Sequence, residues 1–182
     1  MRDLKKKLLL LICLMLSTAC ADDVQTVYSK YRADFVYDKV STTDPLYKAL
    51  TGAGMFCSIY RQGGKQYFTS PYETTYRNLT DLNLYQRYVT INGFIVGLAN
   101  QTEMGTTVLP LLCYDRVCPN CYEEGHNYSL ALQENGFAYC SRCKRKYNLN
   151  DGGLIAEGDN GLKLIRYHIM YDGLNNMRIY NP

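Results

Sequence analysis

The stretches CYDRVCPNCYEEG (113–125) and CSRCKRKYNLNDGG (140–153) place two CxxC pairs 18 residues apart. This spacing, C-x2-C-x18-C-x2-C, lies in the range used by four-thiolate zinc sites. One CxxC turn can direct two sulfurs at a point, and a second turn completes a tetrahedron. The spacing therefore predicts a small metal-binding lobe over about residues 111–150, with these ligands: Cys118, Cys121, Cys140 and Cys143.

The same four cysteines allow other chemistry. Cysteines of exported proteins often form disulfides, so two bridges among these positions remain open. A [2Fe–2S] cluster is a further alternative for four thiolates. CPNC is also typical of thiol oxidoreductases, whose first Cys lies at a helix N-terminus. Because Gly125 follows Cys121 so closely, we expect no helix there and disfavour redox catalysis.

Basic residues crowd the second CxxC pair. They can offset the negative charge of a four-thiolate metal site, or they can form a solvated loop face: Arg142, Lys144, Arg145 and Lys146. The sequence leaves both readings open.

Residues 1–19 have the pattern of a secretory signal peptide. A basic start, MRDLKKK, precedes LLLLICLML, an apolar run too short to span a bilayer. The segment ends in LSTAC, which resembles a lipobox, so we expect Cys20 to be acylated; an ordinary cleaved signal is the alternative. The expected product is an outer-membrane lipoprotein, on the periplasmic side or at the cell surface. Its tether would cover 20–26 and its domain 27–182.

The charge changes when the expected signal peptide is removed. Four of the 20 basic and one of the 17 acidic side chains leave with residues 1–19, so 16 of each remain. A chain without net charge has no general affinity for nucleic acid. The membrane is the one partner that the sequence indicates, and no protein or ligand partner can be read from it.

Composition and patterning predict an all-β protein, or nearly so. The chain has 18 Tyr, 14 Gly and no Trp. We expect one short helix over 42–52, with Asp44 as its N-cap and Gly52 at its end, and a loop over 71–85. We expect strands over 31–38, 55–61, 65–70, 87–91, 93–99, 106–115, 128–132, 136–140, 163–171 and 177–181. The base under the lobe would combine residues 27–110 and 151–182.

Cys57 and Cys113 remain once the four expected ligands, the expected lipid site and Cys13 of the signal peptide are set aside. They either form one disulfide or serve as small buried apolar residues, and the sequence does not decide between these roles.

From residue 113 onward the chain resembles the Rieske domain. Cys118 and Cys140 match the cysteines of its two ligand pairs, Tyr147 matches its later aromatic residue, and Gly152–Gly153 matches its glycine turn. The resemblance implies an antiparallel β domain with a metal lobe, and it extends to exported Rieske-like lipoproteins of Gram-negative anaerobes. The ligands depart from the family, because Asn120 and Cys143 stand where its histidines would be.

That departure shapes the expected function. The chain has two histidines, His126 and His168, and neither falls at a ligand position. We also find no Gly-rich phosphate loop, no Ser–His–Asp spacing and no HExxH motif. We therefore expect a non-catalytic lipoprotein with structural Zn²⁺. The alternatives are a [2Fe–2S] electron carrier and a disulfide-stabilised surface binding protein.

Overall fold

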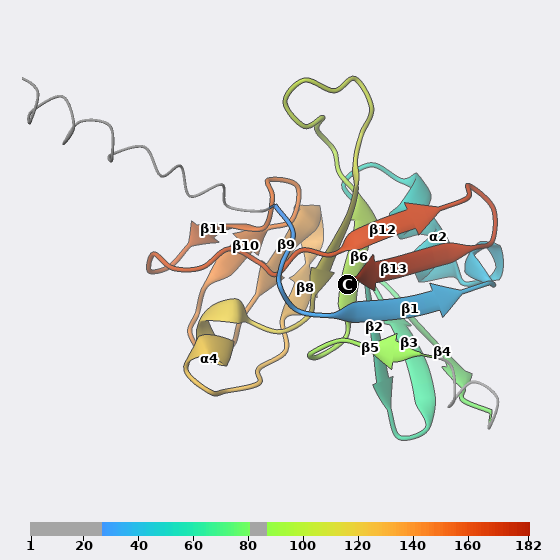
Figure 1. Cartoon of the computed structure of the whole chain (residues 1–182), viewed down its shortest axis with the longest axis horizontal. Helices are drawn as coiled ribbons and strands as arrows, with labels where there is room; N and C mark the ends of the chain where they lie inside the picture. The colour runs from blue at the N-terminus through green and yellow to red at the C-terminus, as the bar shows by residue number, and fades with distance from the viewer. Residues whose placement is uncertain (1–26, 81–86) are drawn as a thin grey trace, which may run out of the picture.

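The computed structural model describes residues 27–80 and 87–182. The expected signal peptide and lipidated Cys20 lie outside these residues. Within them the chain forms 13 strands in three antiparallel sheets, with few helices (Figure 1). The prediction of a predominantly β protein is confirmed.

The five-stranded sheet, which we call the base sheet, has the order β4-β3-β2-β6-β7. Its strands are β4 (Thr74–Asn78), β3 (Lys65–Thr69), β2 (Phe56–Gln62), β6 (Phe94–Leu98) and β7 (Leu111–Asp115). The β2–β3 hairpin turns at Gly63 and Gly64, whose φ angles of 55° and 72° suit a tight turn that glycine adopts without strain.

Two four-stranded sheets flank the base sheet. The outer sheet has the order β12-β13-β1-β5, with strands His168–Tyr171, Met177–Asn181, Ala33–Tyr37 and Tyr88–Val89. The lobe sheet has the order β11-β10-β9-β8, with strands Leu154–Glu157, Lys146–Asn148, Phe137–Tyr139 and Ala131–Gln133. Figure 1 shows the lobe sheet and helix α4 (Pro119–Glu123) on the left, away from β12 and β13.

The base sheet is covered on both faces. Along β6, Phe94 and Val96 belong to the core shared with the outer sheet, whereas Ile95 belongs to the core shared with the lobe. Along β7, Cys113 contributes to the first core and its neighbour Tyr114 to the second. Successive side chains of a strand point to opposite faces, so the unbroken apolar run 93–99 marks a strand buried on both sides.

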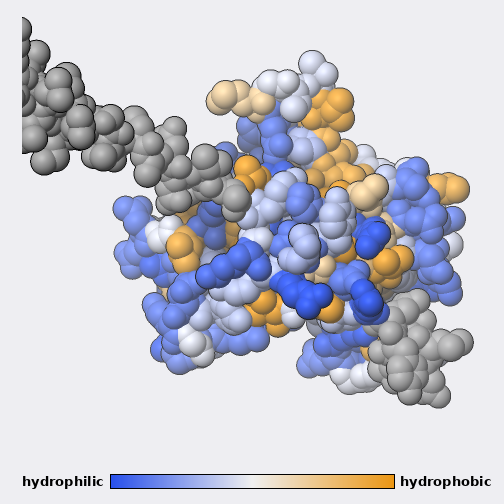
Figure 2. Space-filling model, in the orientation of Figure 1, coloured by the Kyte–Doolittle hydropathy of each residue, from blue (hydrophilic) through white to orange (hydrophobic). Residues whose placement is uncertain are grey.

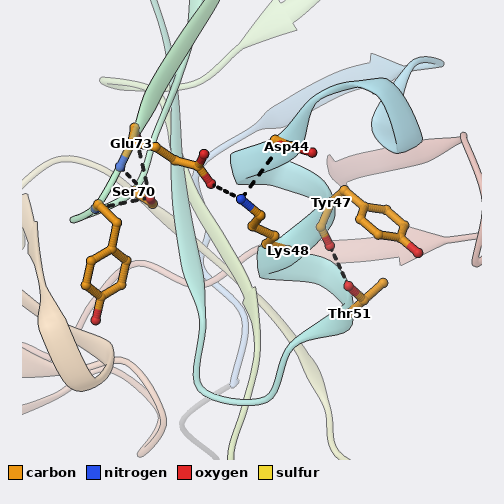
Figure 3. Close-up of polar contacts among 7 residues, drawn as sticks. Asp44, Tyr47, Lys48, Thr51, Ser70 and Glu73 are labelled. Carbon is orange, nitrogen blue, oxygen red and sulfur yellow. Dashed lines mark hydrogen bonds and ion pairs between the residues drawn. The ribbon is translucent and has the colours of Figure 1, made fainter.

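Helix α2 (Asp44–Thr51) closes one end of the first core, after a short 3-10 turn, η1 (Val40–Thr42). Figure 3 shows Lys48 between Asp44 and Glu73; its Nζ lies 2.8 Å from a Glu73 oxygen and 3.7 Å from one of Asp44. The predicted helix is confirmed with one change: Thr43 occupies the N-cap position, and Asp44 lies in the first turn.

Two expectations about local structure were wrong, and two strands were missed. The segment 71–85, expected as a loop, contains the edge strand β4, whose side chains alternate between exposed and half-buried. Two strands that were not predicted, β10 and β11, lie on either side of the turn at 149–153. The first CxxC pair, expected to lack a helix, carries the five-residue α4. A second 3-10 turn, η2 (Glu134–Gly136), joins β8 to β9.

The lobe also has different limits from those expected. β7 at its expected start pairs with β6 in the base sheet, while β11 beyond its expected end belongs to the lobe sheet. The limits of the lobe depend on which distant strands pair with one another, and no local sequence signal predicts that pairing.

Candidate metal centre

The four cysteines of the CxxC pairs meet at the end of the lobe. Their sulfur atoms all lie within 4.8 Å of one another. The Cys118 and Cys143 sulfurs are 3.5 Å apart, and those of Cys121 and Cys140 are 3.7 Å apart. These separations approach the edge of a ZnS₄ tetrahedron, about 3.8 Å for Zn–S bonds of about 2.3 Å. The group can therefore hold a metal ion.

The first pair is positioned by α4. Cys118 precedes the helix, and Cys121 lies one turn later on the same side. The Cys118 N–H donates to the Tyr128 carbonyl at 2.8 Å, and the Tyr122 N–H donates to the Cys118 carbonyl at 3.0 Å. Burial raises the pKa of both thiols. The lowered pKa typical of a redox nucleophile is therefore not seen at this pair.

The second pair lies in the tight turn between β9 and β10. The Lys144 N–H donates to the Cys140 carbonyl at 2.9 Å, and the Cys140 N–H donates to the Arg145 carbonyl at 3.0 Å. Lys144 takes the left-handed conformation with φ 62°, which a non-glycine residue rarely adopts. The turn directs Cys140 and Cys143 toward the first pair.

Cys143 is the one partly exposed ligand candidate; the other three are buried. Burial opposes its ionisation, but the backbone N–H and the guanidinium of Arg145 donate to the sulfur and lower its pKa to about 7. The guanidinium also donates to the carbonyls of Asp159 and Asn160, at 2.9 and 3.2 Å. Arg145 is therefore held where a thiolate charge develops.

The other basic residues of this turn have different contacts. Lys146 forms an ion pair with Glu157 at 2.8 Å, and the Arg142 guanidinium lies 5.9 Å from the centre of the Tyr128 ring. Of the four basic side chains near Cys143, Arg145 is the one whose contact with its sulfur supports charge compensation.

A series of polar contacts connects the first CxxC pair to the segment that follows β11. The Asn120 Nδ2 donates to the Tyr147 hydroxyl at 2.8 Å, and this hydroxyl lies 3.3 Å from the Cys118 sulfur. Because the phenol oxygen accepts from Asn120, its own hydrogen is free to point at the sulfur. The Leu162 N–H donates to Asn120 Oδ1 at 2.9 Å, so residue 120 also anchors a segment 42 positions away.

The backbone at Gly161 lies close to the Asn120 side chain. A Cβ added to Gly161 would lie 2.1 Å from Asn120 Oδ1. The resemblance to the Rieske domain drew attention to Asn120 and Tyr147, but nothing in the sequence predicted that they contact each other.

The remaining predicted residues lie elsewhere. Cys57 on β2 and Cys113 on β7 are free, buried, and both opposite Val96 on the strand between them. Two strand spacings put them about 10 Å apart, beyond the roughly 7 Å that a disulfide spans between Cα atoms. They therefore pack as small apolar residues, and burial raises the pKa of each thiol. The disulfide alternative for this pair does not fit the fold.

The side chains of both histidines contact aromatic rings. His126 is exposed and lies edge-on to Tyr128, with ring centres 6.1 Å apart. His168 on β12 stacks between Tyr28 and Tyr180. Neither belongs to the four-sulfur group.

Comparisons of the chain with known protein families, with curated proteins and with solved structures found no match. In residues 27–80 and 87–182, no helix has the length and apolar character needed to cross a membrane.

Proposed function

We propose that this chain is a non-catalytic, lipid-anchored protein whose lobe is held by one structural Zn²⁺. The observation that carries the proposal is the convergence of four cysteine sulfurs from two separate turns within 4.8 Å. Four thiolates in a tetrahedron are the donor set of structural zinc sites, which leave no position open for a substrate.

The donor geometry favours one metal ion over a [2Fe–2S] cluster. A binuclear cluster divides its four cysteines between two irons, so two sulfurs are separated from the other two by the whole cluster. Here all four sulfurs lie within 4.8 Å of one another, so neither close pair is set apart from the other by the width of a cluster. Such a compact group suits a mononuclear tetrahedron better.

The surroundings of the sulfurs also suit a charged metal–thiolate group. Arg145 donates to the Cys143 sulfur, and Tyr147 lies at the Cys118 sulfur with its hydroxyl oriented by Asn120. Donors of this kind stabilise thiolate ligands and fix their orientation.

The lipid anchor and the Rieske-like relationship complete the proposal, and both rest on the sequence. LSTAC ends the expected signal peptide and supports acylation of Cys20 at the outer membrane. The order of the two Cys pairs around a β hairpin, followed by Tyr147 and Gly152–Gly153, supports a Rieske-like origin in which cysteine replaces the histidine ligands.

Metal and thiol analysis of protein purified without oxygen tests the zinc site. We expect one zinc per chain and no visible absorption band. A visible band with a spin signal in the reduced state would instead establish an iron–sulfur cluster. Absence of metal together with absence of free thiols among the four would establish two disulfides. Incorporation of labelled fatty acid, lost in Cys20→Ala, tests the anchor separately.

A further inference from the structure

The solvent side of the outer sheet combines apolar and basic side chains. One cross-strand row on this side contains His168, Tyr180, Asp34 and Val89. The next row contains Met170, Arg178 and Val36. Residues directly opposite each other on neighbouring strands point to the same side of a sheet, so these side chains form one surface, which we call the headgroup face.

Large apolar side chains on the headgroup face are open to solvent. Val36 is 49% exposed, Val89 42% and Met170 59%. In Figure 2 strongly hydrophilic residues lie beside hydrophobic ones over β1, β12 and β13. These apolar side chains lie among charged ones on one side of the sheet, so a partner could contact both kinds at once.

The charged side chains that line a groove on the headgroup face are mainly positive. Arg32, Arg87 and Arg178 line this groove of about 540 Å³, together with Asp34. Arg87 forms an ion pair with Asp34 at 3.2 Å, while Arg32 and Arg178 form none with the part of the chain that is described. Since the expected mature chain has equal numbers of basic and acidic residues, this is a local excess that favours an anionic partner.

The N-terminal segment leaves the fold from the same face. The Tyr28 ring stacks on His168 of β12 with ring centres 3.5 Å apart. The Ser29 N–H donates to the Arg166 carbonyl at 3.0 Å, and Asn181 Nδ2 donates to the Ser29 carbonyl at 2.6 Å. These contacts fix the point from which the chain runs back toward Cys20. Seven residue steps separate Cys20 from Val27, a span of at most about 25 Å.

From this geometry we infer that the headgroup face lies against the anionic headgroups of the membrane. Arg32 and Arg178 contact lipid phosphates, and Val36, Val89 and Met170 enter the interfacial region. The inference rests on the proposed lipid anchor, and it assigns a second contact that orients the domain. Lipidated proteins commonly combine an acyl anchor with a basic surface in this way.

Vesicle binding by the metal-loaded mature chain, residues 20–182 with Cys20→Ser, tests the face without the acyl chains and without the basic signal peptide. We expect it to sediment with vesicles of equal parts phosphatidylcholine and phosphatidylglycerol, less so at high salt, and not with pure phosphatidylcholine. The double variant Arg32→Gln/Arg178→Gln should weaken this binding by roughly fivefold for each arginine. Lys65→Gln/Arg142→Gln removes the same charge from the base sheet and the lobe, and it should bind as the parent chain does.

Tryptophan fluorescence provides the site-specific readout, because the chain has no Trp of its own. Met170→Trp should shift to the blue on anionic vesicles and be quenched by brominated lipids. Tyr72→Trp, at a residue 67% exposed outside the headgroup face, should change little. The inference would be overturned if the two Trp variants responded equally, or if both double variants lost binding equally. It would also be overturned if the parent chain bound neither kind of vesicle.

Inorganic phosphate separates a bilayer contact from a small-anion site. If phosphate at low concentration abolishes vesicle binding while added chloride of the same ionic strength does not, the groove holds a free anion and the bilayer inference fails. Because acylation is absent from these assays, their failure would leave the proposed anchor and zinc site untouched. Failure of fatty-acid incorporation would in turn remove the anchor without affecting vesicle binding.

Discussion

The core between the outer sheet and the base sheet differs in its contents from the core between the base sheet and the lobe. The first includes Phe35, Phe68 and Phe94, all fully buried, on strands of five residues. The second includes three of the four site cysteines beside Tyr114 and Tyr147. The lobe strands are only three or four residues long.

This difference indicates what stabilises each of the two cores. The free energy gained by apolar burial is proportional to the area removed from water. The large apolar side chains of the first core can therefore stabilise it without a metal. The core on the lobe side has fewer buried residues, and three of the four candidate metal ligands are among them. A structural metal would supply there the stabilisation that short strands cannot.

The largest expected effect comes from removing one ligand of the lobe. Cys140→Ser should lose the metal, because a three-thiolate site is left with a weaker oxygen donor. Structural zinc contributes on the order of 10 kcal/mol in small zinc peptides, and less where a base sheet supports the loops. Limited proteolysis should cut within the lobe, between β7 and the end of β11 (116–157), while the base stays resistant. Cys57→Ser, a control outside the four-sulfur group, should retain the metal.

The complementary change in the first core should act on the whole protein. Phe94→Ala removes a fully buried ring and should cost about 3–5 kcal/mol of unfolding free energy. Denaturant unfolding would measure this loss, and metal content under native conditions should not change. Selective loss of metal from folded Phe94→Ala would show that the two cores are not separable.

A smaller effect is expected at the contact between Asn120 and residues 161–162. Gly161→Ala places a Cβ against Asn120 Oδ1 and should displace the amide from Leu162 and Tyr147. The expected cost is about 1–3 kcal/mol, measured by unfolding and by the rate of metal loss to a chelator. In an Asn120→Ala background the same change should cost much less, because the clash is gone. Equal costs in both backgrounds would rule out this contact as the cause.

The smallest effect is expected from one hydroxyl beside the metal centre. Tyr147→Phe removes the group 3.3 Å from the Cys118 sulfur and should weaken metal affinity roughly tenfold. Tyr114→Phe is the matched control: its hydroxyl donates to the Leu149 carbonyl at 2.9 Å in the same core but contacts no sulfur. It should lower the unfolding free energy and leave metal affinity unchanged. Chelator competition distinguishes the two.

Local signals in the sequence were sufficient for the features that depend on neighbouring residues. The β2–β3 turn follows from two adjacent glycines, and α2 follows from its Pro45 start and Gly52 end. Two CxxC turns at zinc-site spacing predicted which four cysteines gather, because each turn sets the geometry of its own pair. Turns, helix ends and CxxC pairs can be predicted because they depend on residues that are close together in the sequence.

Long-range packing decided the rest. β4 is a strand because it pairs with β3, although its own residues are polar. Cys57 and Cys113 stay apart because β6 runs between their strands, and Asn120 meets Leu162 across 42 positions. In each case the free energy comes from hydrogen bonds and buried contacts between segments distant in the chain, so the partners are defined only once the three sheets have come together.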